Sequence, residues 1–293
     1  MIDPSEQLRG LARRVADAYI AQTDARAILL VGSAASGEAD YYSDLDLVLY
    51  HEHLPSEQAL AEARRNIDAE RFRLSFQSEY GYGERYYLGA VECQLGHATI
   101  RHAEHTFARV VRELELEAEL LKIISGLFDG IPLHGADLIE RFRRDCTYTD
   151  RLRRAMIEKH WKFFPWWYFQ ERLRTRDANV WRYEVLVRSV YGLLGVLAAI
   201  NGVYFSTLEF KRAAKFVSRL QVAPTNLAAR LEALFAQDER ASTADLERLV
   251  DETATLVSTH FPDIDLTLQW AGQPTAPGSR EAPWTLDEPQ TSR

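Results

Sequence analysis

The chain has 293 residues, of which 46% are apolar and 27% charged, a balance ordinary for a soluble globular protein of one large or two ordinary domains. Its formal net charge of −8 argues against broad nucleic-acid binding and is compatible with a cationic partner. The two cysteines, Cys93 and Cys146, are too few for a disulfide framework. We therefore expect buried, reduced thiols, no signal peptide before the polar first residues, and a cytoplasmic location.

The first half of the chain alternates between helical and strand patterns. Apolar side chains recur at helical spacing near the start, and apolar runs or apolar–polar alternation follow. The expected elements are a helix at 4–22, strands at 27–31 and 47–50, a helix at 55–71, and strands at 72–79 and 86–95 with a glycine-containing loop at 81–83 between them.

The second half of the chain is predicted to be helical throughout. The expected helices are 103–128 (one long or two short), 138–143, 147–176 with a kink at Pro165, 180–200, 207–220, 224–236 and 242–260. The apolar helix ending at residue 200 is interrupted by Arg188, so we expect a core helix rather than a membrane span. Within it, Glu184 and Arg188 are spaced to form an ion pair.

These elements predict two domains of different class. Residues 1–145 form an α/β (α+β) domain with a small mixed sheet, and residues 146–265 form an all-α helical bundle. Residues 266–293 are rich in Gly, Pro, Ser, Thr and Glu, which predicts a disordered tail. The aromatic segment 161–169 is interpreted as helix packing, with a wall for a sugar or nucleobase as the alternative.

Two carboxylates and a Gly-Ser pair mark the most informative stretch. Asp44 and Asp46 lead into the second strand, where alternation places both on one face and the intervening leucine in the core. Adjacent carboxylates repel each other unless a divalent cation such as Mg²⁺ lies between them. Gly32 and Ser33 end the first strand, where a close backbone approach and a hydroxyl suit a phosphate. The stretch therefore predicts a metal site beside a phosphate site.

The segment 32–47, Gly-Ser-Ala-Ala-Ser-Gly-Glu-Ala-Asp-Tyr-Tyr-Ser-Asp-Leu-Asp-Leu, resembles the nucleotidyltransferase superfamily that includes DNA polymerase beta. It looks most like the small-molecule branch, which includes the streptomycin/spectinomycin and lincosamide adenylyltransferases linked to antibiotic resistance. The resemblance implies an Mg²⁺-dependent adenylyltransferase that uses ATP or another nucleoside triphosphate. The close match covers about 25 residues, and a looser one extends over most of the chain.

Further residues are candidates for the same chemistry. Two-metal nucleotidyl transfer needs a third carboxylate on an adjacent strand, and Glu92 is the best-placed glutamate, as metal ligand or as general base. Lys211 and Lys215 share one face of the expected helix 207–220, where positive charge would oppose a triphosphate; a solvated basic face is the alternative. His97, His102 and His105 follow the Glu92 strand and are interpreted as surface or loop residues.

The implied reaction moves a nucleoside monophosphate, most simply AMP from ATP, to a hydroxyl of a small acceptor and releases pyrophosphate. An aminoglycoside-like acceptor fits the acidic charge, and a lincosamide would fit an apolar cleft. Two alternatives stay open: a toxin-type enzyme that modifies tRNA or protein, and a module that binds nucleotide without catalysis. We expect no membrane partner, and nucleic acid is the less favoured acceptor.

Overall fold

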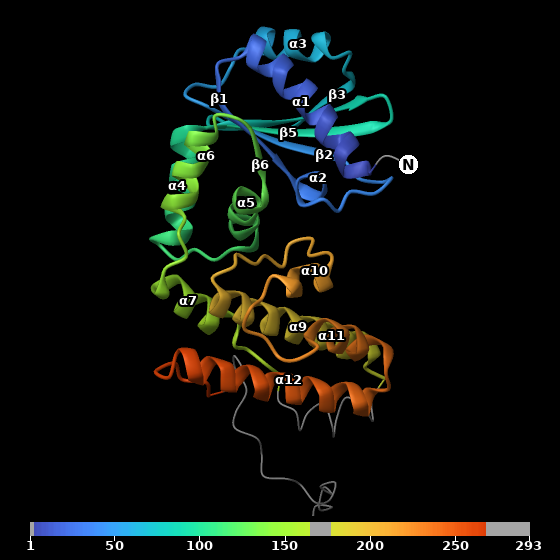
Figure 1. The fold of residues 1–293 in the computed structure, drawn as a ribbon, viewed down its shortest axis with the longest axis vertical. Helices are drawn as coiled ribbons and strands as arrows, with labels where there is room; N and C mark the ends of the chain where they lie inside the picture. Colours follow the sequence, from blue (N-terminus) through green and yellow to red (C-terminus); the bar gives the residue numbers. More distant parts are fainter. Residues whose placement is uncertain (1–2, 165–176, 268–293) are drawn as a thin grey trace, which may run out of the picture. The chain divides into compact units, whose positions relative to one another are not determined.

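The computed structural model describes residues 3–164 and 177–267, and element labels follow Figure 1. Contacts divide the chain into two compact units, one made of Met1–Ile157 with Ala198–Phe216 and the other of Glu158–Leu197 with Val217–Arg293. The predicted boundary at 145 lies inside the first unit, which also takes in a segment from beyond it. The predicted disorder of the tail concerns residues that lie almost wholly outside the described ranges.

The bounds of the described elements are as follows. The helices are α1 (Pro4–Gln22), α2 (Gly32–Ser36), α3 (Glu57–Asn66), α4 (Ile100–Val111), α5 (Ala118–Asp129), α6 (Ala136–Asp145), α7 (Asp150–His160), α9 (Asn179–Asn201), α10 (Ala213–Ser218), α11 (Leu227–Ala236) and α12 (Glu239–His260). The strands are β1 (Ala25–Val31), β2 (Leu45–His51), β3 (Glu70–Gln77), β4 (Gly81–Leu88), β5 (Val91–Thr99) and β6 (Ile131–His134).

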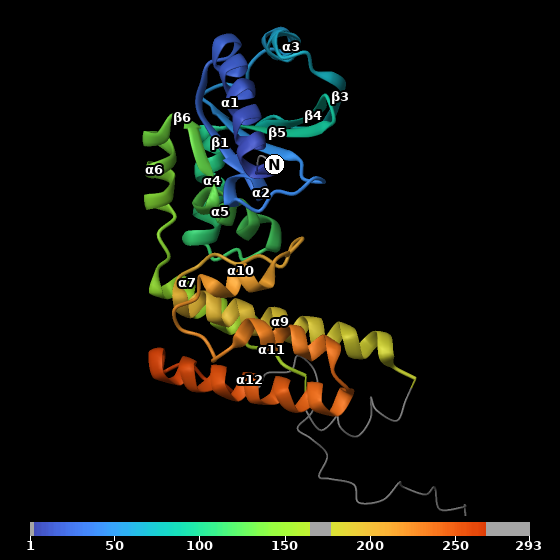
Figure 2. The same cartoon turned by 45° about the vertical axis from the view of Figure 1, so that its right-hand side comes forward.

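The first unit is built on one mixed sheet with strand order β3-β4-β5-β2-β1-β6, which confirms the predicted fold class. Strands β2 and β5 pair in parallel, and the other neighbouring pairs are antiparallel. Helices α1 and α3 cover one face, and α4, α5 and α6 lie against the other (Figures 1 and 2). Towards the start of β2 the second face carries polar side chains, and this is where the candidate site lies.

The strand alternation in β2 positions that site. Leu45, Leu47 and Leu49 are at most 2% exposed and pack into the core beneath α1, so the intervening side chains must point to the opposite face. Helix α1 supplies the facing apolar stripe and begins where the Asp3 side chain accepts the Ser5 backbone N–H, with Pro4 in the first turn.

Three local predictions were wrong. The expected loop at 81–83 belongs to β4, because its glycines serve close strand packing: a Cβ at Gly81 would stand 2.5 Å from the His97 carbonyl oxygen. The single strand expected at 86–95 is instead a hairpin that turns at Gly89, which has φ +60°. The part of the chain from residue 103 onwards, predicted to be helical throughout, also contributes the short edge strand β6.

The helix expected at 207–220 is reduced to the six residues of α10. Residues before it are irregular, and Glu209 and Arg212 have φ values of +50° and +59°, which an α-helix does not contain. Contacts made by Glu209 and Arg212 with the first unit replace the helical hydrogen bonds there, as described below.

The described elements of the second unit are all helical, as predicted. Helix α9 is long and apolar enough to cross a membrane by length and composition, but 72% of its most apolar stretch is buried within the protein, as in a core helix. The predicted pair of Glu184 and Arg188 forms, at 2.5 Å. Trp161 and Phe163 of the aromatic segment are buried, and the rest of that segment from residue 165, with the kink at Pro165, lies outside the described ranges.

A buried polar cluster lies between the sheet and helices α1 and α3. Glu84 of β4, 1% exposed, accepts hydrogen bonds from the Tyr19 hydroxyl at 2.5 Å and from Arg64, and contacts His97 Nε2 at 3.1 Å. His97 Nδ1 lies 3.1 Å from His51 Nε2. The prediction of a surface position is therefore wrong for His97, whose strand turns it into the core, but is confirmed for His102 and His105. Both cysteines are buried and free, as expected.

Candidate active site

Asp44 and Asp46 lie side by side on the polar part of the sheet. Asp46 stands opposite Val31 of β1 and Gln94 of β5 in the strand register, so strands from both sides fix its position. Within the described part of the chain, no hydrogen bond or ion pair reaches the Asp46 carboxylate. A half-buried carboxylate without a partner, next to a second carboxylate, is a costly arrangement in the absence of a cation.

The pKa of Asp46 reflects that cost. Burial raises the pKa of Asp46, and the charge of Asp44 raises it further, to about 7. The positive charges of Lys122 and Lys211 act in the opposite direction, while Glu209 adds to the rise. Burial and the adjacent Asp44 thus outweigh the nearby lysines in disfavouring the Asp46 charge, and a divalent cation bound by both aspartates would offset this.

Gly32 makes room for Asp46. It begins helix α2 with φ +71°, a backbone conformation that favours glycine, and a Cβ at this position would collide with the Asp46 carboxylate. Ser33 follows on the first turn of α2. The far end of this short helix is fixed by Arg9, which donates to the carbonyl oxygens of Ala34 and Ala35 at 2.9 and 3.0 Å.

We expect Gly32→Ala to destabilise the first unit by about 1–2 kcal/mol, since alanine brings both backbone strain and a clash with Asp46. Thermal unfolding measures the effect. Gly10→Ala is the matched control: Gly10 lies in α1 with nothing within 4 Å of an added Cβ, so this variant should be neutral or slightly more stable. Equal behaviour of the two variants would contradict the assigned role of Gly32.

Glu92 lies on β5, on the same face as Asp44, but its carboxylate is engaged elsewhere. It pairs with Arg85 at 3.0 Å and accepts the Tyr87 hydroxyl at 2.8 Å. The β5 side chain that contacts Asp44 is Gln94, whose Nε2 donates to Asp44 Oδ2 at 2.7 Å. Among the described residues, no three His, Cys, Asp or Glu side chains gather as a metal site. The two aspartates thus offer a cation two carboxylates and one amide neighbour.

Gln94 was missed by sequence reasoning. Its signal is the strand register: once β2 and β5 are paired in parallel, the residue opposite Asp46 is Gln94, two positions after Glu92. The sequence alone contains no indication of that pairing, since the two strands are separated by two other strands and a helix.

The predicted cations both belong to the first unit, Lys211 just before α10 and Lys215 within it. Lys211 is exposed, makes no hydrogen bond or ion pair within the described ranges, and is one of the charges that act on Asp46. Lys215 instead donates to the Ser36 carbonyl oxygen at 2.5 Å and lies 3.6 Å from Glu38, at the C-terminal end of α2. A third cation, Lys122 of α5, acts on Asp46 more strongly than Lys211 and was not predicted.

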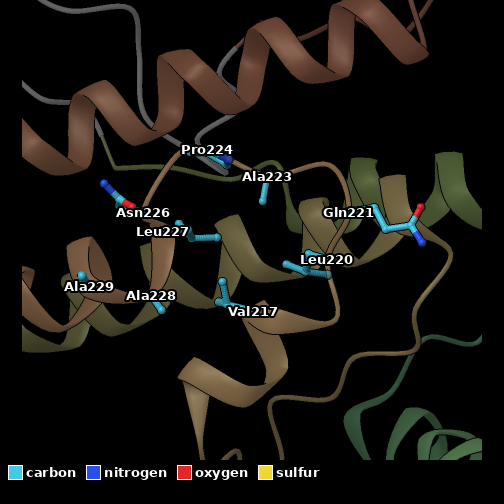
Figure 3. Close-up of a pocket in the computed structure, with 9 residues that line it drawn as sticks. All are labelled: Val217, Leu220, Gln221, Ala223, Pro224, Asn226, Leu227, Ala228 and Ala229. Atoms are coloured by element: carbon cyan, nitrogen blue, oxygen red, sulfur yellow. The ribbon is translucent and has the colours of Figure 1, made fainter.

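A pocket in the second unit lies apart from these residues in the chain. Figure 3 shows it lined by residues between 217 and 229, mostly apolar, among them Leu220, Pro224 and Leu227. None of the predicted site residues lines it.

Comparisons with known proteins add little to this geometry. No family model and no curated protein matches the sequence. Among solved structures, the Cid1 poly(U) polymerase, studied for its UTP selectivity and with MgGTP bound, aligns with 14% identity and a TM-score of 0.30. The alignment covers 73% of this chain and 56% of that one, so the chain spans little more than half the length of the polymerase. A likeness at this level assigns no function.

Proposed function

We propose that the chain is a nucleotidyltransferase: it transfers a nucleoside monophosphate from a nucleoside triphosphate to a hydroxyl and releases pyrophosphate. The observation that carries the proposal is the pair of Asp44 and Asp46, of which Asp46 is half-buried, has no partner among the described residues and has a pKa raised to about 7. Two adjacent carboxylates are stabilised when a divalent cation binds between them, and the bound cation can in turn bind the phosphates of a nucleotide.

The particular reaction we propose is Mg²⁺-dependent adenylyl transfer from ATP. Magnesium held by Asp44 and Asp46 would neutralise phosphate charge and lower the pKa of the acceptor hydroxyl. Gly32 keeps the backbone close to Asp46 and Ser33 offers a hydroxyl to the β- and γ-phosphates. Lys211 supplies opposing positive charge, and we keep Lys215 as a second such residue, although here it holds the end of α2.

Glu92 remains our candidate for the third carboxylate, as metal ligand or as the base that removes the hydroxyl proton. Its contacts with Arg85 and Tyr87 mean that it must change partners to do either. For the acceptor we propose a small hydroxylated molecule of the aminoglycoside kind, on the resemblance of residues 32–47. We propose a cytoplasmic location on the two reduced cysteines.

Calorimetry and a pyrophosphate-release assay test this proposal. We expect ATP to bind tightly only with Mg²⁺, and pyrophosphate to appear with aminoglycosides in a screen that also supplies lincosamides, sugars and tRNA as acceptors. GTP, CTP and UTP are run in parallel to establish base preference. Mg²⁺-independent binding of ATP, or binding without turnover for every acceptor, would instead indicate a non-catalytic nucleotide-binding module.

A further inference from the structure

The segment 203–212, which we call the return segment, connects α9 to α10, belongs to the first unit and contacts other parts of that unit near both of its ends. Near its start, the Ser206 hydroxyl donates to the Ala118 carbonyl oxygen at 2.6 Å. At its end, Arg212 donates to the Glu38 carbonyl oxygen at 2.5 Å and lies 3.6 Å from Asp40. The left-handed φ values of Glu209 and Arg212 are unfavourable for these residues, so these contacts must hold the backbone in place.

Between these two ends, Glu209 forms an ion pair with Lys122 of α5. Lys122 lies one turn before Gly126, on the same face of the helix, and a Cβ at Gly126 would touch the Val31 side chain at 3.7 Å. Val31 is the residue opposite Asp46 in the β1–β2 register. The helix face that carries Lys122 is thus directed at the strand position of the proposed metal ligand.

The electrostatic data agree with this geometry. The Glu209 carboxylate is held by Lys122 on the α5 face that Gly126 turns towards Val31. Lys122, followed by Lys211, holds the pKa of Glu209 below its usual range. Through its ion pair with Lys122, Glu209 therefore brings a negative charge to the helix face that is directed at the site we propose receives a triphosphate.

An exposed ion pair of this kind is weak enough to exchange partners. The side chains of Lys122 and Glu209 are 47% and 64% exposed, and such pairs contribute about 0–1 kcal/mol. A phosphate oxygen offers Lys122 the same charge-assisted hydrogen bond as the Glu209 carboxylate. The Glu209 carboxylate thus occupies the position on Lys122 that a phosphate oxygen could take instead.

We propose that Lys122 belongs to the triphosphate-binding subsite together with Lys211, and that Glu209 is a built-in competitor which the incoming triphosphate displaces from Lys122. This inference rests on the proposed function. Its physical consequence is that the chain limits its own affinity for polyphosphate, and that removing the Glu209 charge relieves the limit.

Binding of inorganic tripolyphosphate and of ATP, each with Mg²⁺, to the full-length protein tests the proposal by calorimetry. Glu209→Gln should lower the dissociation constant of both ligands about fivefold, and Lys122→Ala should raise it about tenfold. In the Lys122→Ala background, Glu209→Gln should gain less than twofold, because the competition is for Lys122. The matched control is Glu52→Gln, which breaks the similarly exposed Arg26–Glu52 pair at 3.3 Å and should leave both constants unchanged.

Each result decides the question. A Glu209→Gln dissociation constant within twofold of the wild type, or an equal gain with and without Lys122, overturns the competitor role. Unchanged affinity in Lys122→Ala overturns the subsite. Absence of ATP and tripolyphosphate binding to the wild type would instead contradict the proposed function itself, so the two failures are distinguishable. Thermal unfolding of every variant shows that the comparison is made between folded proteins.

Discussion

Asp46→Asn is expected to abolish nucleotidyl transfer, by at least about a thousandfold, and at the same time to stabilise the metal-free protein at neutral pH. The two effects have one cause. The Asp46 carboxylate is half-buried next to Asp44 and finds no partner in the described part of the chain, so its charge is unfavourable until a cation binds. Asparagine removes that charge, and with it the capacity to hold Mg²⁺, while keeping the shape of the side chain.

The pH dependence of the stabilisation has a definite sign. The pKa of Asp46 is about 7 in the folded protein, whereas an unfolded aspartate has a pKa of about 3.9. The folded state therefore binds this proton more tightly, so the contribution of Asp46 to stability is most favourable below about pH 4 and is lost as the pH rises towards 7. The difference corresponds to about 4 kcal/mol at most, and because Asp46 is only half-buried we expect about 2–3 kcal/mol.

Urea unfolding in EDTA at a series of pH values measures this effect as the difference between Asp46→Asn and the wild type. We expect the two proteins to have equal stability near pH 4 and the variant to gain steadily up to pH 7. Added Mg²⁺ should stabilise only the wild type. Asp17→Asn, at an exposed position of α1, is the control and should show no pH-dependent gain. A variant that transfers nucleotide at the wild-type rate would contradict the metal assignment.

The part of the site that the sequence predicts is the part that is local in sequence. Gly32, Ser33, Asp44 and Asp46 belong to one strand–turn–strand unit, where alternation alone decides which side chains share a face. Gln94 and Lys122 join the site through the β2–β5 pairing and the packing of α5, which no periodicity reveals. Lys211 was selected for its charge. It lies on the part of the expected helix 207–220 that comes before α10 and is not helical in the structure.

The fold, like the site, has a part that could be predicted from local sequence patterns and a part that depends on contacts distant in sequence. The mixed sheet followed by helices could be predicted because each element carries its own apolar pattern. The hairpin of β4 and β5 could not be predicted, because Gly81 and Gly83 are residue types typical of a loop. Only the structure shows that neighbouring strands leave no room for a Cβ at these two positions. His97 was misplaced for a related reason: its polarity suggests the surface, but partners distant in sequence, Glu84 and His51, satisfy it in the core.

Glu84→Ala is expected to cost the first unit about 3–5 kcal/mol, the largest stability effect of any variant considered, while leaving the site residues untouched. Glu84 is the acceptor shared by Tyr19, Arg64 and His97. Burial by itself would raise the pKa of Glu84, but the hydrogen bonds and charges of these partners outweigh burial and lower it, so the group is ionised. Its removal leaves the guanidinium of Arg64, whose side chain is 9% exposed, facing the core without its buried counter-charge.

Urea unfolding at pH 7 compares this variant with Glu84→Gln and Glu52→Ala. Glutamine keeps the volume and can still accept the Tyr19 hydroxyl, but it offers Arg64 no charge, so we expect an intermediate loss. Glu52→Ala breaks an ion pair whose side chains are more than half exposed, and it should cost less than about 1 kcal/mol. If Glu84→Ala cost no more than Glu52→Ala, the cluster would not be a support of the sheet. The stability of β4, and through it the position of β5 and Gln94 beside Asp44, would then have to come from the apolar contacts of α1 and α3 alone.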